Sequence, residues 1–165
     1  MRSTSLNRHR GDVPALRAQA KLYFLASAAL LAGLIFYTDI RPGGWWDRGI
    51  PPGWLNALPS LVHVYGFILL SATACWTDKR RWPYLCLFWL GLSGLLEILQ
   101  AEPIASKLVQ WLSTETPLLP ATALARRYLS AGTFAVSDLL ATAVGTACAW
   151  YTLRRTAASN RLREQ

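Results

Sequence analysis

The sequence predicts an all-α membrane protein of four transmembrane helices, with two short amphipathic helices in the outer connection between spans three and four. Three observations predict this class: an apolar composition, four separate apolar stretches and an uneven distribution of basic residues. Of the 165 residues, 53% are hydrophobic and only 16% are charged, which is too apolar a balance for an ordinary small soluble domain. The length fits one compact domain, and four spans with their connections use nearly all of it.

The four apolar stretches are each long enough to cross a bilayer. They cover residues 22–38, 60–76, 83–101 and 134–153, with lengths of 17 to 20 residues. At about 1.5 Å per residue the shortest reaches about 25 Å, slightly less than a hydrocarbon core of about 30 Å, so flanking Trp, Lys and Arg side chains complete the crossing. The alternative, buried core helices of a soluble protein, requires a polar shell that this composition does not supply.

The first apolar stretch also has the basic flank of a secretory signal peptide. Residues 37–42 read Tyr-Thr-Asp-Ile-Arg-Pro, which offers no small-residue cleavage pattern. We therefore interpret this stretch as an uncleaved span.

Basic residues predict the orientation, because Lys and Arg beside a span collect on the cytoplasmic side. Twelve of the seventeen lie in three segments: Arg2, Arg8, Arg10, Arg17, Lys21; Lys79, Arg80, Arg81; and Arg154, Arg155, Arg161, Arg163. Residues 1–21 and 154–165 are accordingly predicted as basic cytoplasmic segments on either side of a membrane domain at 22–153. The net charge of +8 follows from this asymmetry and from attraction to membrane lipids, and it needs no nucleic-acid partner.

Aromatic residues provide an independent indication, since Trp and Tyr prefer the two membrane interfaces. The predicted inner belt is Tyr23, Trp76, Trp82, Tyr84, Trp150 and Tyr151, and the predicted outer belt is Tyr37, Trp45, Trp46, Trp54, Tyr65, Trp111 and Tyr128. Of the eight tryptophans, only Trp89 falls well inside a span.

The connection at 102–133 contains two amphipathic patterns. Ile104, Leu108, Val109 and Leu112 share one helical face, and Leu124, Ala125, Tyr128 and Leu129 share another. These patterns predict two helices on the outer membrane surface, which act either as an interfacial spacer or as a lid over a site beneath.

Three ionisable residues lie inside the spans, where such groups usually face a bundle interior or a cavity. His63, Glu97 and Asp138 are predicted three to four residues inside the outer ends of spans two, three and four, which places all three about 4 to 6 Å below the boundary. Gln100 and Thr142 follow the two carboxylates by about one helical turn. The small residues Gly66, Gly91, Gly94, Ala141, Gly145 and Ala149 are predicted to bring these helix faces together.

A His and two carboxylates in a partly dry site could donate and accept protons, or could bind a cation or a polar headgroup. The same three side chains could instead bond to one another and only fix the packing of the helices. They lack the spacing of a diagnostic metal site, so no metal and no cofactor are predicted.

These residues resemble motifs of the VanZ-like membrane proteins of bacteria, a family named after a teicoplanin resistance factor. In that family one span carries a His before an aromatic-rich run, a second carries a Glu with a Gln three residues later, and a third carries an Asp with Asn four and Gly seven residues later. The similar segments here are LVHVYGF with His63, LLEILQ with Glu97 and Gln100, and SDLLATAVG with Asp138 and Gly145. Order, spacing and predicted topology are similar over residues 20–153.

The sequence also departs from the family pattern at three points. Thr142 stands where the family usually has Asn, and Gly132 stands where it commonly has Arg, for which Arg126 or Arg127 could substitute. The 41 positions from Glu97 to Asp138 also exceed the usual separation.

The resemblance implies a protein of the bacterial inner membrane with a role in the cell envelope, and a link to glycopeptide resistance. The first hypothesis is an envelope factor whose outward polar pocket, formed by His63, Glu97, Gln100, Asp138, Thr142, Arg126 and Arg127, binds a lipid or cell-wall precursor headgroup. The second is a membrane hydrolase or transferase acting on such a lipid, with His63, Glu97 and Asp138 as candidate catalytic residues. The third is an accessory subunit of a membrane protein complex in which the polar cluster is structural.

Overall fold

The computed structural model describes residues 8–36, 38, 57–76, 78–115, 120–131 and 134–161. Within these residues the chain is all-helical and contains no strand, which confirms the predicted all-α class. The elements are α1 (Arg8–Ile35), α2 (Leu58–Ala74), the 3-10 helix η3 (Lys79–Arg81), α3 (Trp82–Leu99), α4 (Glu102–Glu115), α5 (Pro120–Ala131) and α6 (Val136–Arg161).

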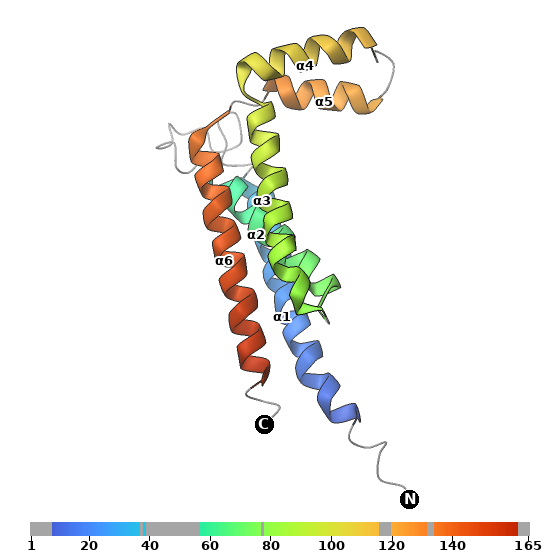
Figure 1. Cartoon of the computed structure of the whole chain (residues 1–165), viewed down its shortest axis with the longest axis vertical. Coiled ribbons are helices and arrows are strands. Elements are labelled where there is room, and N and C mark those ends of the chain that lie inside the picture. The colour runs from blue at the N-terminus through green and yellow to red at the C-terminus, as the bar shows by residue number, and fades with distance from the viewer. Residues whose placement is uncertain are drawn as a thin grey trace, which may run out of the picture.

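Four long helices form a bundle, and two shorter ones project from one of its ends. Figure 1 shows α1, α2, α3 and α6 running along the long axis, with α4 and α5 crossing above them as a helical hairpin. Helix α2 occupies the centre, because it packs against α1, α3 and α6, and α3 also packs against α6. The first turns of α1 and the last turns of α6 lie at the end of the bundle opposite the hairpin (Figure 1).

Each predicted span coincides with one bundle helix, but α1 and α6 are longer than predicted. Helix α1 begins at Arg8 and α6 continues to Arg161, so both extend through segments predicted as separate cytoplasmic tails. The reason is local, because Ala, Arg, Gln and Lys around residues 15–21 are good helix formers and need no apolar face to continue a helix already nucleated.

Two of the described helices are long and apolar enough to cross a membrane, judged by length and composition. They are Ala15–Ile35 of α1 and Lys79–Leu99, which comprises η3 and α3. Helix α2 is equally apolar but has only 17 residues. Helix α6 is less apolar, since it has Asp138 in its first turn, several Ala, Thr and Gly residues along its length, and Arg154, Arg155 and Arg161 toward its end.

Polar and aromatic contacts join the described residues between α2 and α3. Asp78 accepts a hydrogen bond from the backbone N–H of Arg80 (3.3 Å), and its other oxygen forms an ion pair with Arg81 Nε (2.8 Å). The rings of Trp76 and Trp82 contact each other across this turn, with centroids 5.5 Å apart. Pro83 then occupies the first turn of α3, where its missing N–H leaves no hydrogen bond unmade.

The apolar core lies in the half of the bundle farther from the hairpin. Its fully buried members are Leu22 and Ala26 of α1, Ile68, Leu69 and Ala72 of α2, and Ala149 and Leu153 of α6. The half nearer the hairpin is less completely buried, and Glu97 of α3 and Asp138 of α6 lie there.

Candidate functional site

Two of the three predicted ionisable residues come together between α3 and α6. The carboxylates of Glu97 and Asp138 are close enough to interact electrostatically. Close approach of the helices places them there, because a Cβ on Gly94, one turn before Glu97, would lie 3.7 Å from Leu139 Cδ2, in ordinary van der Waals contact. The carboxylate pair is therefore formed by residues 41 positions apart in the sequence.

Two buried polar atoms in this region have no hydrogen-bond partner among the described residues. They are Oε2 of Glu97 and Oγ1 of Thr142, whose residue is only 1% exposed. A buried acceptor without a donor destabilises the folded chain by about 1–3 kcal/mol. The carboxylate oxygen of Glu97 is suited to a ligand that donates hydrogen bonds, whereas the hydroxyl of Thr142 can also donate one.

His63 lies on a different face from the carboxylates. It packs against Gly33 of α1, where an added Cβ would be only 2.7 Å from His63 Nε2, and its ring is tilted against Phe67 with centroids 6.3 Å apart. On α2, residues 62, 63 and 66 face α1, whereas Leu61 and Val64 face α6. The structure thus divides the predicted trio into a carboxylate pair and a separate histidine.

The predicted close packing at small residues holds at some positions and fails at one. Gly145 of α6 contacts the backbone of Leu61, and Gly66 of α2 packs on Leu30 and on the carbonyl of Ala26. Gly91 has no neighbouring atom within 4 Å of an added Cβ, so the prediction that it brings α3 against a partner is wrong. At about 100° per residue, Gly91 is about 60° around α3 from Gly94 and about 120° from Glu97, which turns it away from the contact with α6.

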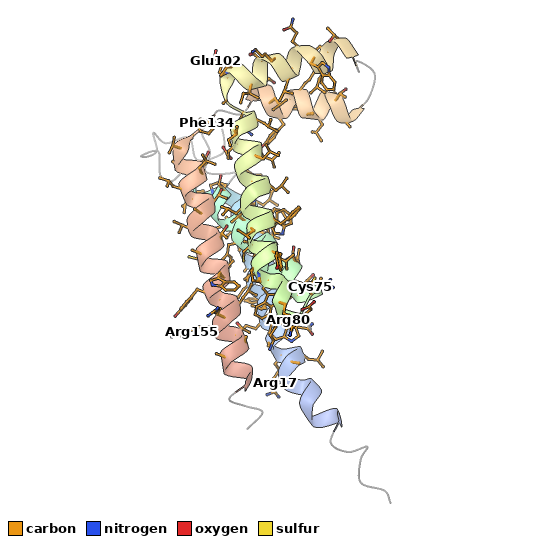
Figure 2. All side chains as sticks on the ribbon, viewed as in Figure 1. Arg17, Cys75, Arg80, Glu102, Phe134 and Arg155 are labelled. Carbon is orange, nitrogen blue, oxygen red and sulfur yellow. The ribbon has the colours of Figure 1, made fainter. Side chains whose placement is uncertain are left out.

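A pocket of about 650 Å³ lies where α3, α4, α5 and the segment before α6 meet. Its lining residues are Gln100, Ala101, Glu102, Pro103, Ala105, Ser106, Val109, Leu129, Ser130 and Phe134. Figure 2 marks this region by Glu102 and Phe134, at the end of the bundle that carries the hairpin. Of the predicted site residues only Gln100 lines this pocket. It follows Glu97 by one helical turn, whereas the carboxylates of Glu97 and Asp138 do not line the pocket.

The two arginines predicted as substitutes for the family arginine do not line this pocket. Arg126 Nη1 donates a hydrogen bond to Ser113 Oγ of α4 (3.3 Å), which ties α5 to α4. Arg127 is exposed on α5. Gly132, the position where the family commonly has its arginine, lies outside the described residues.

Several residues around this region were not predicted from the sequence as site residues. Ala105 and Leu129 are each 7% exposed and pack between α4 and α5 at the pocket wall, whereas the amphipathic patterns predict that Leu129 faces the membrane surface. The apolar periodicity of α4 and α5 indicates that these side chains are covered. It does not distinguish burial in a membrane from burial against a neighbouring helix.

Trp89, the tryptophan predicted inside a span, has a defined structural environment. Its Nε1 donates a hydrogen bond to Ser71 Oγ (2.9 Å), and its ring stacks on Phe67 with centroids 4.8 Å apart. Tyr65, predicted in the outer belt, has its hydroxyl 3.3 Å from Thr152 Oγ1, in the half of α6 that leads to the basic end. Of the other predicted outer aromatics, Tyr37, Trp45, Trp46 and Trp54 lie outside the described residues.

Among the described residues no group of three or more His, Cys, Asp or Glu side chains is arranged to hold a metal ion. Comparisons with known proteins matched no family model, no curated protein and no solved structure. The resemblance to the VanZ-like family therefore stays a prediction that rests on the motifs around His63, Glu97 and Asp138.

Proposed function

We propose that this chain is a VanZ-like protein of the bacterial inner membrane in which α1, α2, α3 and α6 all span the bilayer. The burial of the two candidate spans supports a membrane as their surroundings. Only 22% of the apolar window of α1 and 11% of that of α3 are buried within the chain, whereas core helices of soluble proteins are mostly buried. The apolar side chains of these helices, among them Phe24, Leu31, Leu87 and Phe88, point outward.

The proposed orientation places both termini in the cytoplasm. Arg17, Arg80 and Arg155 come from three separate segments and lie toward the same end of the bundle in Figure 2. The hairpin and the pocket of about 650 Å³ are at the opposite end, which becomes the outer face by the positive-inside rule.

The proposed activity is binding of a lipid or cell-wall precursor headgroup at this outer pocket. The observation that carries it is the buried, unsatisfied Oε2 of Glu97 beside Asp138, one helical turn from Gln100 at the pocket wall. Two adjacent carboxylates favour a ligand that presents amino or hydroxyl donors, since such a ligand satisfies the acceptor and offsets the like-charge repulsion. Glycopeptide sensitivity is the cellular property that we connect to this binding, from the family resemblance.

Enzymatic action on an envelope lipid has less support. That hypothesis uses His63 as a base oriented by the carboxylates, and His63 packs on Gly33 instead of contacting either of them. The third hypothesis is an accessory subunit in which the polar cluster is purely structural. Absence of specific lipid binding in the following experiment would favour it.

The test is native mass spectrometry of lipids and lipid-linked precursors that copurify with the wild type and with Glu97→Gln, Asp138→Asn and His63→Gln. We expect one envelope lipid with a donor-rich headgroup to be lost in the two carboxylate variants and kept in His63→Gln. The histidine variant is the matched control, because its residue is at a similar depth on another helix face. Bulk-like lipid in all four samples would overturn the binding proposal, and loss in His63→Gln alone would contradict the carboxylate site.

A further inference from the structure

A second pocket, of about 460 Å³, lies between α1 and α6 at the end of the bundle opposite the hairpin. Arg17 and Lys21, one turn apart on α1, and Arg155 on α6 contribute its basic side chains. The pocket extends along α1 from Arg17 to Leu25 and along α6 from Tyr151 to Ser159, which at about 1.5 Å per residue is about 12 Å of each helix. It is thus an elongated groove with one wall from each of these two helices.

The charge of this groove is not neutralised by the described part of the protein. Three cations line it and no carboxylate does. Arg17 and Lys21 are four residues apart on one helix, an arrangement in which like charges repel each other. Arg155 places its guanidinium 5.5 Å from the centroid of the Tyr151 ring, which orients the side chain without cancelling its charge. An anion is therefore the complementary ligand.

The end of the groove nearer the hairpin is less polar than its basic end. There Tyr65 of α2 has its hydroxyl beside Thr152 of α6, and Leu25 contributes apolar surface from α1; Ala18 adds apolar surface between Arg17 and Lys21. Hydroxyls of Thr156 and Ser159 also line it. A groove between two helices with a cationic end and a partly apolar end suits an amphiphile better than a small free anion.

We propose that this groove binds the phosphate headgroup of an anionic phospholipid, with Arg17, Lys21 and Arg155 around the phosphate and the less polar end of the groove, near Leu25 and Tyr65, against the first part of an acyl chain. Basic pockets between helices on the cytoplasmic side of a membrane are a known setting for phosphate headgroups. The inference rests on the membrane location proposed above and is independent of the carboxylate pair at the other end of the molecule.

The test measures binding of phosphatidylglycerol and phosphatidylcholine with identical acyl chains to the purified full-length chain by native mass spectrometry. Arg155→Gln is compared with Arg154→Gln, because Arg154 is the adjacent arginine, is not part of the groove and lies over Trp150. Arg17→Gln/Lys21→Gln is compared with Lys79→Gln/Arg80→Gln, which removes the same charge from η3. All six side chains are exposed, so their replacement should leave the fold intact, and thermal unfolding checks that each variant is folded.

We expect Arg155→Gln to weaken phosphatidylglycerol binding about fivefold and the double variant more than tenfold, with both control variants within about twofold of the wild type. Phosphatidylcholine binding should not change. Equal losses in the matched controls would show general attraction to a basic surface and would overturn the proposal. Displacement of phosphatidylglycerol by millimolar inorganic phosphate or glycerol phosphate would overturn the assignment to a lipid. Glu97→Gln and Asp138→Asn leave this groove intact. Loss of phosphatidylglycerol binding at the groove can therefore be distinguished from loss of headgroup binding at the outer pocket.

Discussion

Gly145 of α6 packs directly against the backbone carbonyl of Leu61 on α2. A Cβ at this position would overlap the Leu61 oxygen and would lie 3.0 Å from Val64 Cγ1. The carbonyl belongs to a helix backbone and cannot move aside as a side-chain end can, so the contact between α2 and α6 depends on the missing side chain. Because α2 is the central helix, this contact fixes the position of α6, and with it the position of Asp138.

Gly145→Ala is expected to destabilise the protein, since the added methyl group must separate α6 from α2. Overpacking of this kind typically reduces the free energy of unfolding by about 1–3 kcal/mol. Gly91→Ala is the matched control, because Gly91 has open space around it and Ala is the better helix former. Thermal unfolding of the purified proteins in one detergent measures both changes, and equal destabilisation by the two substitutions would contradict the described packing.

Trp89→Phe is expected to reduce stability modestly, because Phe keeps the stack on Phe67 but loses the hydrogen bond to Ser71 Oγ. A hydrogen bond of this kind makes a net contribution of about 0.5–1.5 kcal/mol to the free energy of unfolding. A double-mutant cycle with Ser71→Ala isolates this bond, since the second substitution should have little further effect once Trp89 is Phe. Strictly additive effects in the cycle would mean that the two side chains are not coupled. Trp111→Phe, at an exposed tryptophan of α4, is the control.

Glu97→Gln is expected to leave the empty protein as stable as the wild type or more stable, although it removes headgroup binding. The reason is that Glu97 Oε2 is a buried acceptor without a donor and that the carboxylate of Asp138 repels it. In an Asp138→Asn background, Glu97→Gln should raise the free energy of unfolding less than it does in the wild type. The expected difference between the two backgrounds is about 0.5 kcal/mol or more. Unfolding measurements on the delipidated variants test this, with the exposed Glu102→Gln as control. A large loss of stability in Glu97→Gln would indicate that the residue has a structural role.

The proposed topology predicts which positions a membrane-impermeant maleimide can reach. In a background with Cys75, Cys86 and Cys148 replaced by Ser, Thr114→Cys of the hairpin should be labelled in intact cells. Arg80→Cys of η3 should react only after the inner membrane is permeabilised. Labelling of Arg80→Cys in intact cells would contradict cytoplasmic placement of the basic end.

The helices themselves were predictable from local patterns. Apolar runs and amphipathic periodicity in the sequence indicated all six α-helices of the described residues, because both depend only on side chains a few positions apart. The extension of α1 and α6 beyond their apolar segments was missed, since boundaries in polar, helix-favouring sequence have no hydrophobic marker.

The candidate site was only partly predictable. The level of His63, Glu97 and Asp138 along the bundle follows from counting residues, and two of the three do meet. The third does not, because the direction in which a residue points turns by about 100° per position and its partner depends on how neighbouring helices are placed around α2. The pocket beside Gln100 also needs α4 and α5 to lie over the end of α3. The amphipathic patterns allowed either a lid of this kind or an interfacial spacer and could not decide between them.

The sequence by itself determined that this protein is helical, where the apolar helices lie and which end of the bundle is basic, because composition and periodicity act over short stretches of chain. Only the tertiary structure decided that Glu97 pairs with Asp138, that His63 packs on Gly33, and that Arg17, Lys21 and Arg155 line one groove. Those relationships arise from contacts between helices far apart in the sequence, and such contacts are set by the interlocking of backbone and side chains at positions such as Gly145 and Leu61.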